Sequence, residues 1–290
     1  MFILLAFFAF AGYASEYDGS SLQGNTAQRD GRELTDTQWL NDLDSLALFI
    51  RTLHPHPYWK TPKDVFDEHI ARVREQIPLL SDDQIIVELM KIAALVGDGH
   101  TQLLGNKLTS KWFPIRIESF ADGWFITSAA TKYSRAYGAR VLRIGNTIIE
   151  DVISKVLKVV PADNEWGAKY LTPKYLMMSS VMQTLGCVDK NGLLELEIMQ
   201  KDGTRINLKV LAEPYQTENA FSDMVAAWFW RKNAVPAADY VNVINRNPSI
   251  LPLVFQNYEK PYWFTYLPQQ KTIYFGFNEC QPPKNSQGNY

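Results

Sequence analysis

One short segment of the sequence places residue types that could do acid–base chemistry on a turn: Gly97-Asp98-Gly99-His100-Thr101. Its two glycines permit tight or left-handed backbone, and Asp98 can hold the loop by accepting hydrogen bonds from local amides. A neutral histidine on such a loop, with an ordinary pKa of ~6.5, can take a proton as a general base. The alternative interpretation is a helix stop, a turn former and an exposed loop histidine.

Other residues that could do chemistry form weaker patterns. The histidines of His54-Pro55-His56 could join His100 around a metal ion, but no carboxylate pattern lies near them. We therefore predict a helix-ending loop there and no metal site. Arg140 and Arg143 flank an expected strand and could receive a peptide carboxylate, although exposed arginines on a strand are ordinarily just solvated.

Three helices are predicted to bring the chain to this loop. Apolar residues recur at helical spacing from Asp36 to His54, from Thr61 to Pro78 and from Ser81 to Gly97. Proline restricts the residue before it, which ends the first helix, and Ser81 with Gln84 forms a capping box at the start of the third. Three capped amphipathic helices with short connections predict a small helical domain.

Beyond the loop the apolar period changes to two, which is typical of strands. Helices followed by strands and hairpins in this order predict a mixed α+β chain. We predict, in chain order, a hairpin of 112–118 with 124–128, a strand at 139–144, a helix capped by Thr147, a helix within 172–185, a hairpin of 193–199 with 206–211, an aromatic segment of undecided type at 221–230, and a strand pair of 262–266 with 272–277.

The composition argues against some partners. The 290 residues carry 29 Lys and Arg against 31 Asp and Glu, a formal net charge of −2, so no broad positive field exists to attract nucleic acid. Cys187 and Cys280 lie far apart and outside any metal-type spacing, and their pairing stays open. We expect no cofactor and no metal, and the oligomeric state stays open.

The first fourteen residues have the layout of a secretory signal peptide. An apolar run from Phe2 to Phe10 is followed by Gly12 and Ala14 and then by polar residues from Ser15. The run is shorter than the ~20 residues that cross a bilayer as a helix. The alternative is a buried N-terminal strand or helix. We predict a signal peptide at 1–14, a linker at 15–34, and export to a periplasmic, extracellular or cell-surface location.

The order of these segments resembles the N-terminal part of the tail-specific (C-terminal-processing) serine peptidase family. The resemblance spans about residues 36–278 and rests on the glycine-histidine loop, on Trp112-Phe113-Pro114-Ile115 and on the stretch 137–146. It implies an α+β / α/β chain with an N-terminal helical domain at 35–111, a PDZ-like module at 112–215 and the first strands of an incomplete α/β catalytic domain at 216–290.

The resemblance also implies roles for residues of the loop. In the tricorn-like branch of the family the histidine of this loop is the general base for a serine nucleophile, whereas another branch uses serine and lysine. What carries over is a catalytic role for His100, support of the loop by Gly97, Asp98, Gly99 and Thr101, and peptide binding by Arg140 and Arg143.

No serine in the chain has the sequence context of an activated nucleophile. No Gly-x-Ser-x-Gly pattern occurs, and Ser179-Ser180 lies in a predicted amphipathic helix. A general base contributes ~10²–10⁴-fold and does not replace the covalent step. We therefore predict the N-terminal part of an exported serine-type peptidase that acts on peptides or unfolded proteins but is inactive as given. The alternative is a non-catalytic exported peptide-binding module.

Overall fold

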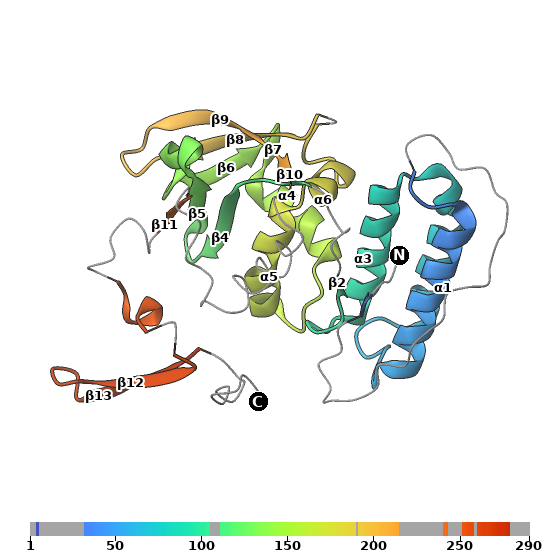
Figure 1. Ribbon diagram of the computed structural model, residues 1–290, viewed down its shortest axis with the longest axis horizontal. Coiled ribbons are helices and arrows are strands. Elements are labelled where there is room, and N and C mark those ends of the chain that lie inside the picture. The colour runs from blue at the N-terminus through green and yellow to red at the C-terminus, as the bar shows by residue number, and fades with distance from the viewer. Residues whose placement is uncertain are drawn as a thin grey trace, which may run out of the picture.

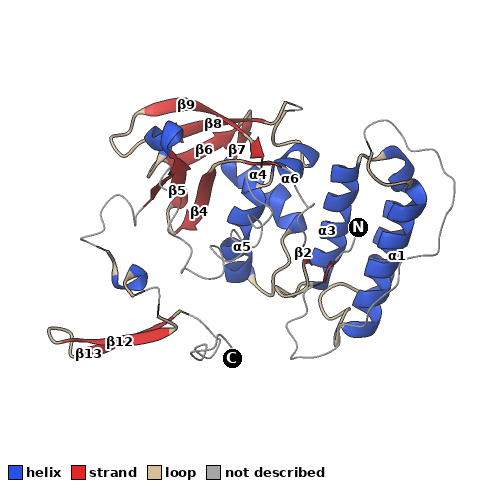
Figure 2. Cartoon of the chain, viewed as in Figure 1, coloured by secondary structure: helices blue, strands red, loops and turns tan. Residues whose placement is uncertain are grey.

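The computed structural model describes residues 4–5, 32–104, 111–189, 191–214, 240–242, 251–257 and 260–278. Within these ranges the chain is a mixed α+β protein, as the order of sequence patterns predicts (Figures 1 and 2). Of the predicted signal peptide only β1 (Leu4–Leu5) is described, and it pairs antiparallel with β2 (Leu103–Leu104). Of the predicted linker at 15–34 only residues 32–34 are described, and the aromatic segment at 221–230 lies outside the described residues.

The three predicted N-terminal helices are confirmed: α1 (Asp36–Leu53), α2 (Lys63–Gln76) and α3 (Asp82–Val96), with the 3₁₀ turn η1 (Ile77–Leu79) between the last two. The Ser81–Gln84 capping box is present at the start of α3, and Thr35 with Gln38 forms another at the start of α1. Each box satisfies backbone N–H groups that a helix leaves without an internal partner.

A seven-stranded antiparallel sheet follows the helices. Its strands are β4 (Ile115–Phe120), β5 (Gly123–Ala130), β6 (Arg140–Ile144), β7 (Thr147–Ile148), β8 (Leu193–Met199), β9 (Arg205–Leu211) and β11 (Tyr240–Asn242). The hydrogen-bonded order is β11-β5-β6-β8-β9, with β4 beside β5 and β7 beside β6. A separate short pair joins β3 (Lys111–Trp112) to β10 (Glu213–Pro214).

Three helices lie between β7 and β8: α4 (Ile149–Val156), α5 (Glu165–Met177) and α6 (Ser179–Thr184). The 3₁₀ turn η3 (Leu157–Val159) follows α4, and the 3₁₀ turn η2 (Thr131–Ala136) lies earlier, between β5 and β6. The prediction that Thr147 caps a helix is wrong. Thr147 pairs with Ile144 in a tight strand turn, and Ile148 is the N-cap of α4. A pairing across Gly145-Asn146 therefore takes precedence over the capping preference of threonine.

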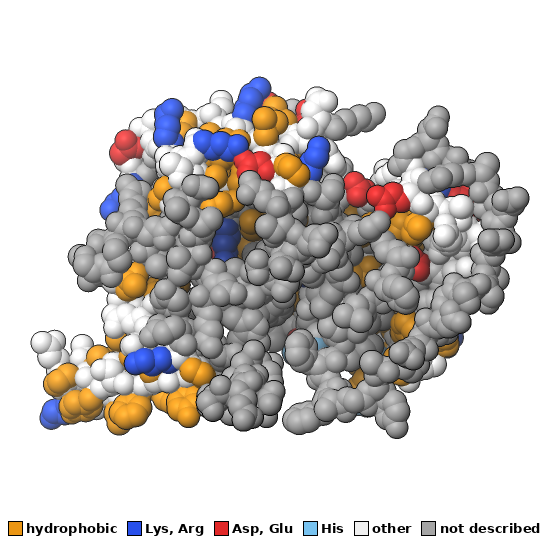
Figure 3. Space-filling view, viewed as in Figure 1, with side chains coloured by type: hydrophobic (Ala, Val, Ile, Leu, Met, Phe, Trp, Pro, Cys, Tyr) orange, Lys and Arg blue, Asp and Glu red, His pale blue; other side chains and the backbone are white. Residues whose placement is uncertain are grey.

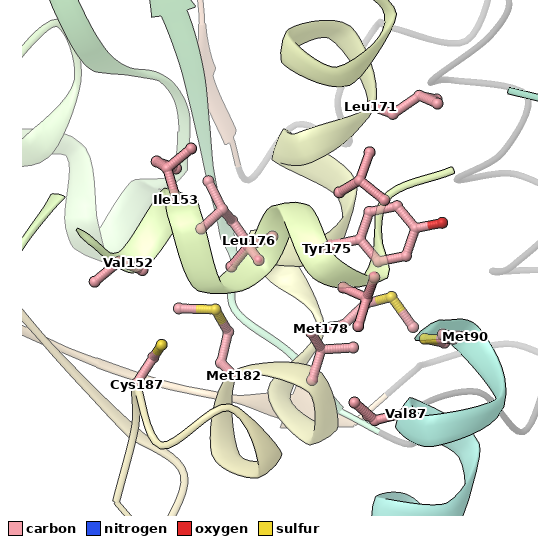
Figure 4. Packing of buried hydrophobic residues seen from close by; sticks show 14 of the residues in the cluster. Val87, Met90, Val152, Ile153, Leu171, Tyr175, Leu176, Met178, Met182 and Cys187 are labelled. Carbon is pink, nitrogen blue, oxygen red and sulfur yellow. The ribbon is translucent and has the colours of Figure 1, made fainter. Parts of the chain in front are cut away.

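One hydrophobic core joins the helices to the sheet. Its buried side chains run from Trp39 in α1 to Val210 in β9. Figure 4 shows how α3 contributes to this core. Its Val87 and Met90 face Tyr175, which is in α5, and Met178, which directly follows α5. Val96, the last residue of α3, is also fully buried, so packing fixes the point from which the glycine-histidine loop starts.

The last described elements form a hairpin of their own. β12 (Tyr262–Leu267) and β13 (Thr272–Phe277) pair antiparallel as predicted, after the 3₁₀ turn η6 (Leu253–Phe255). Figure 1 shows this hairpin at the lower left, away from the other sheets. None of the described helices is both long and apolar enough to cross a bilayer.

Candidate functional site

The loop that carries His100 begins at a left-handed glycine. Gly97 ends α3 with φ of +71°, and its N–H donates to the carbonyl of Ala94 at 3.0 Å. Glycine adopts this conformation without the steric cost that a side chain brings. The Thr101 N–H then donates to the carbonyl of Asp98 at 3.1 Å and closes a turn. The backbone therefore fixes where the loop leaves the helix.

The carboxylate of Asp98 organises the loop. Its Oδ1 accepts the backbone N–H of His100 at 3.0 Å, and its Oδ2 accepts the Thr101 hydroxyl at 2.7 Å. Partial burial alone would raise the pKa of Asp98, but these bonds and a third from His54 lower that pKa below its ordinary value. Asp98 is therefore a fixed negative charge at neutral pH.

The third bond to Asp98 comes from the end of α1. His54 Nε2 lies 3.2 Å from Asp98 Oδ2, and His54 Nδ1 accepts the backbone N–H of His56 at 3.1 Å. Because Nδ1 accepts a hydrogen bond, the proton of a neutral ring is on Nε2, which then donates to the carboxylate. His54 is thus a buried support for Asp98. No group of three potential metal ligands occurs in the part of the chain that the structure describes.

His100 itself is open to solvent. Its Nδ1 lies 3.6 Å from Asp98 Oδ1, which is ion-pair distance but longer than a hydrogen bond, and its side chain is 70% exposed. A carboxylate beside one ring nitrogen favours the proton on that nitrogen and stabilises the imidazolium when the other nitrogen takes up a proton. The arrangement can act as a general base toward a group brought from outside.

A second carboxylate holds the middle of the loop. The Gly99 N–H donates to Asp163 Oδ2 at 3.2 Å, across 64 positions of sequence. A Cβ at Gly99 would lie only 2.9 Å from the same oxygen, so a side chain at this position would push the carboxylate away from its hydrogen bond. The proposed loop-supporting residues therefore lie together, and Asp163 joins them without any signal in the sequence.

A buried lysine completes the support and was missed by the sequence reasoning. Lys174 in α5 is 1% exposed, and its Nζ donates to Gln102 Oε1 at 3.2 Å. Gln102 in turn donates to the Gly99 carbonyl at 3.4 Å. Burial lowers the pKa of Lys174 to about 8, because leaving water disfavours the charged form. The only sequence signal is a lysine within the otherwise apolar and aromatic stretch 173–178.

The two arginines predicted to receive peptide belong to β6. The Arg140 guanidinium occupies the space beside Gly123, with Nε 2.7 Å from where a Cβ would stand. Arg143 donates from Nη2 to the carbonyl of Asn146. These contacts attach both side chains to nearby turns, and their role in peptide binding stays a prediction.

The remaining candidates lie inside the protein. Ser179 and Ser180 are in α6, as predicted, and each is 4% exposed, which leaves neither hydroxyl open to a substrate. Cys187 is buried and has no disulfide partner among the described residues, and burial raises the pKa of its thiol. Its possible partner, Cys280, lies outside the described residues.

Comparison with known proteins adds a distant likeness. Searches against protein-family models and curated proteins gave no match. Among solved structures, a mutant of the protein CPAF superposes with a TM-score of 0.46 at 14% identity, over 62% of this chain and 34% of that one. Mature CPAF complexed with lactacystin gives 0.45 at 14% identity, over 62% and 35%, and mature CPAF alone gives 0.43 at 14%, over 63% and 36%. The chain spans about a third of the length of these proteins, and a likeness of this size assigns it no activity.

Proposed function

We propose that this chain is the N-terminal part of an exported serine-type peptidase in which His100 is the general base. The observation that carries the proposal is the Asp98 carboxylate, held by three hydrogen bonds and 3.6 Å from the Nδ1 of an exposed imidazole. A fixed carboxylate beside one ring nitrogen is what a histidine needs to take a proton on the other.

The proposed chemistry is the transfer of a proton from a serine hydroxyl to His100 as that hydroxyl attacks a peptide carbonyl. The negative charge of Asp98 would stabilise the imidazolium that forms. In this proposal the serine belongs to sequence other than the described residues, because no serine of the chain lies in a Gly-x-Ser-x-Gly pattern and Ser179 and Ser180 are buried. The 290-residue chain would then bind peptide without cleaving it.

The proposed substrates are peptides or unfolded proteins bound in extended form. The sheet supports this mode because β5 already takes up a short added strand. β11 pairs with β5 along residues 128–130, whereas β6 pairs with β5 at Phe125. An extended peptide that adds to a sheet gains main-chain hydrogen bonds in the same way.

To test the proposal, the coding region beyond Tyr290 is sequenced and the protein that it encodes is purified. This protein is then treated with a fluorophosphonate, which labels activated serines. We expect a glycine-rich loop, a serine motif and labelling that Tyr290-terminated protein lacks. Labelling should fall strongly in the His100→Ala variant and stay unchanged in His56→Ala. A stop codon directly after Tyr290 defeats the peptidase proposal. In that case, peptide binding without cleavage would favour the non-catalytic module.

Export is a separate part of the proposal and rests on the apolar run at residues 2–10. Cell fractionation with an antibody to the folded domain tests it. Recovery of the protein outside the cytoplasm, shortened by about the length of the predicted signal peptide, supports export. Full-length protein in the cytoplasm contradicts it.

A further inference from the structure

The β12–β13 hairpin has one face made only of large apolar and aromatic side chains. Neighbours along a strand alternate between faces, and the register pairs Phe264 with Phe275. Six side chains share the face, and each is 55% to 72% exposed: Tyr262, Phe264, Tyr266, Ile273, Phe275 and Phe277. Figure 3 shows apolar side chains gathered over this hairpin at the lower left. Scattered apolar residues are ordinary on a surface, but a continuous face of six marks an interaction site.

On the opposite face of the hairpin, the large side chain of Trp263 packs against residues of the hairpin itself. Trp263 is 8% exposed and lies over Gly276, where a Cβ would be 2.3 Å from the indole Nε1. The ring also packs against Tyr274, with centroids 5.3 Å apart. Among the described residues, the six-residue face is therefore the exposed side of the hairpin.

A hairpin of this kind needs more than its own hydrogen bonds. Two isolated strands are marginally stable in water, and sheets become stable when an apolar face packs against another element. In the part of the chain that the structure describes, β12 and β13 form a sheet with no third strand. The alternation is nonetheless regular over six residue pairs. Both features point to a partner surface for this face.

We propose that the exposed face of the β12–β13 hairpin packs against the same face of a second copy of this chain. Each strand contributes three of the six side chains, so the face is self-complementary about a two-fold axis. Aromatic side chains bury ~150–250 Å² each when fully covered. At the observed exposures, the five aromatic side chains and Ile273 together offer on the order of 700 Å² per copy, and two copies together reach the ~1,200–2,000 Å² of a specific interface.

The geometry of stacked sheets fits this pairing. Two sheet faces pack ~10 Å apart with interdigitating side chains, which suits rows of Phe and Tyr. The face itself carries no charged residue, so its burial leaves no charge unpaired. Lys260 and Lys271 lie at the two ends of the hairpin, outside the six-residue face.

The sequence that the proposed peptidase carries beyond Tyr290 is one competing occupant, and the 290-residue chain used in the test below does not contain it. An anionic lipid surface is another, because aromatic side chains flanked by lysines also bind membranes. Two lysines give only weak attraction to such a surface. A face of six side chains can bury its area against the equal face of a second copy, whereas a lipid surface would cover it only by inserting the hairpin. The observations therefore favour a second copy, and vesicle binding becomes one of the outcomes of the test.

The test is the association state of the 290-residue chain by sedimentation velocity, over a wide concentration range in reducing buffer. The wild type should be a dimer. Phe264→Lys and Phe275→Lys, tested separately, should each raise the dissociation constant by at least ~30-fold, the effect of losing one central interface residue. Leu79→Lys is the matched control, since Leu79 in η1 is 82% exposed and lies on a different element. Its dimer should persist.

A wild-type chain that stays monomeric overturns the proposal, as does a dimer that survives both phenylalanine substitutions. A monomer that co-sediments with vesicles of phosphatidylserine and phosphatidylcholine overturns it in favour of a lipid surface. If the lysine variants fail to fold, the photocrosslinking amino acid benzoylphenylalanine is introduced at position 264 to identify what this face contacts. Photocrosslinking to the hairpin of another copy supports the proposal, and crosslinking only within one copy refutes it.

Discussion

Replacement of Lys174 by methionine should stabilise the protein at neutral pH. Burial lowers the pKa of Lys174 from 10.5 to about 8, a difference of about 2.5 pH units. At ~1.4 kcal/mol per unit this corresponds to ~3 kcal/mol spent on keeping a charged amine inside the protein. Methionine has a similar shape and no charge, but it leaves Gln102 Oε1 without its hydrogen bond, which costs ~1 kcal/mol. The expected net gain at pH 7 is ~2 kcal/mol.

The wild type and the Lys174→Met variant should also differ in their pH dependence. Between pH 8 and pH 10.5 the unfolded chain holds a proton on Lys174 that the folded chain has lost. Stability rises with pH wherever the unfolded state binds more protons. The unfolding free energy of the wild type should therefore rise through this window relative to that of the variant. Below pH 8 the full difference between them should persist.

Urea unfolding followed by tryptophan fluorescence from pH 7 to pH 10.5 measures both effects. Lys169→Met is the matched control, because Lys169 lies on the same helix with its side chain 44% exposed. It should change stability by less than ~1 kcal/mol with no such pH dependence. Refutation would be a Lys174→Met variant less stable than the wild type at pH 7, with a difference between them that does not change from pH 8 to pH 10.5.

Three further predictions concern the loop and its helix. Gly97→Ala should cost ~1–2 kcal/mol in urea unfolding, because φ is +71° and Lys60 fills the space that a Cβ needs. Asp98→Asn should lower stability at pH 7, and the deficit should shrink as pH falls below the unfolded pKa near 3.8, because the bonds to Asp98 lower its folded pKa. Ser81→Ala should cost ~1 kcal/mol through loss of the cap of α3, and a change under 0.3 kcal/mol would contradict that role.

The parts of the fold that depend on neighbours in sequence could be predicted. The capping box at Ser81, the left-handed stop at Gly97 and the alternation that marks β8, β9, β12 and β13 are all local signals. Thr147 shows where local signals compete, since capping preference and a two-residue strand turn share the same residues.

The support of the site could not be predicted, because it joins distant segments. His54 meets Asp98 across 44 positions, and Lys174 meets Gln102 across 72. Neither separation leaves a spacing pattern, and the apolar neighbours of Lys174 in sequence are the only sign that this lysine is buried. The residues of the glycine-histidine loop could be identified from their own types and order in the sequence. Which distant side chains bind to this loop depends on how α1, α3 and α5 pack, and the sequence does not show that packing.

The proposed role of His100 is tested most directly by the rate at which the protein encoded beyond Tyr290 cleaves a fluorogenic peptide. His100→Ala should lower that rate by ~10²–10⁴-fold at unchanged folding, since a general base contributes about this much. His56→Ala should cleave at the wild-type rate. Cleavage by His100→Ala at the wild-type rate would contradict the account.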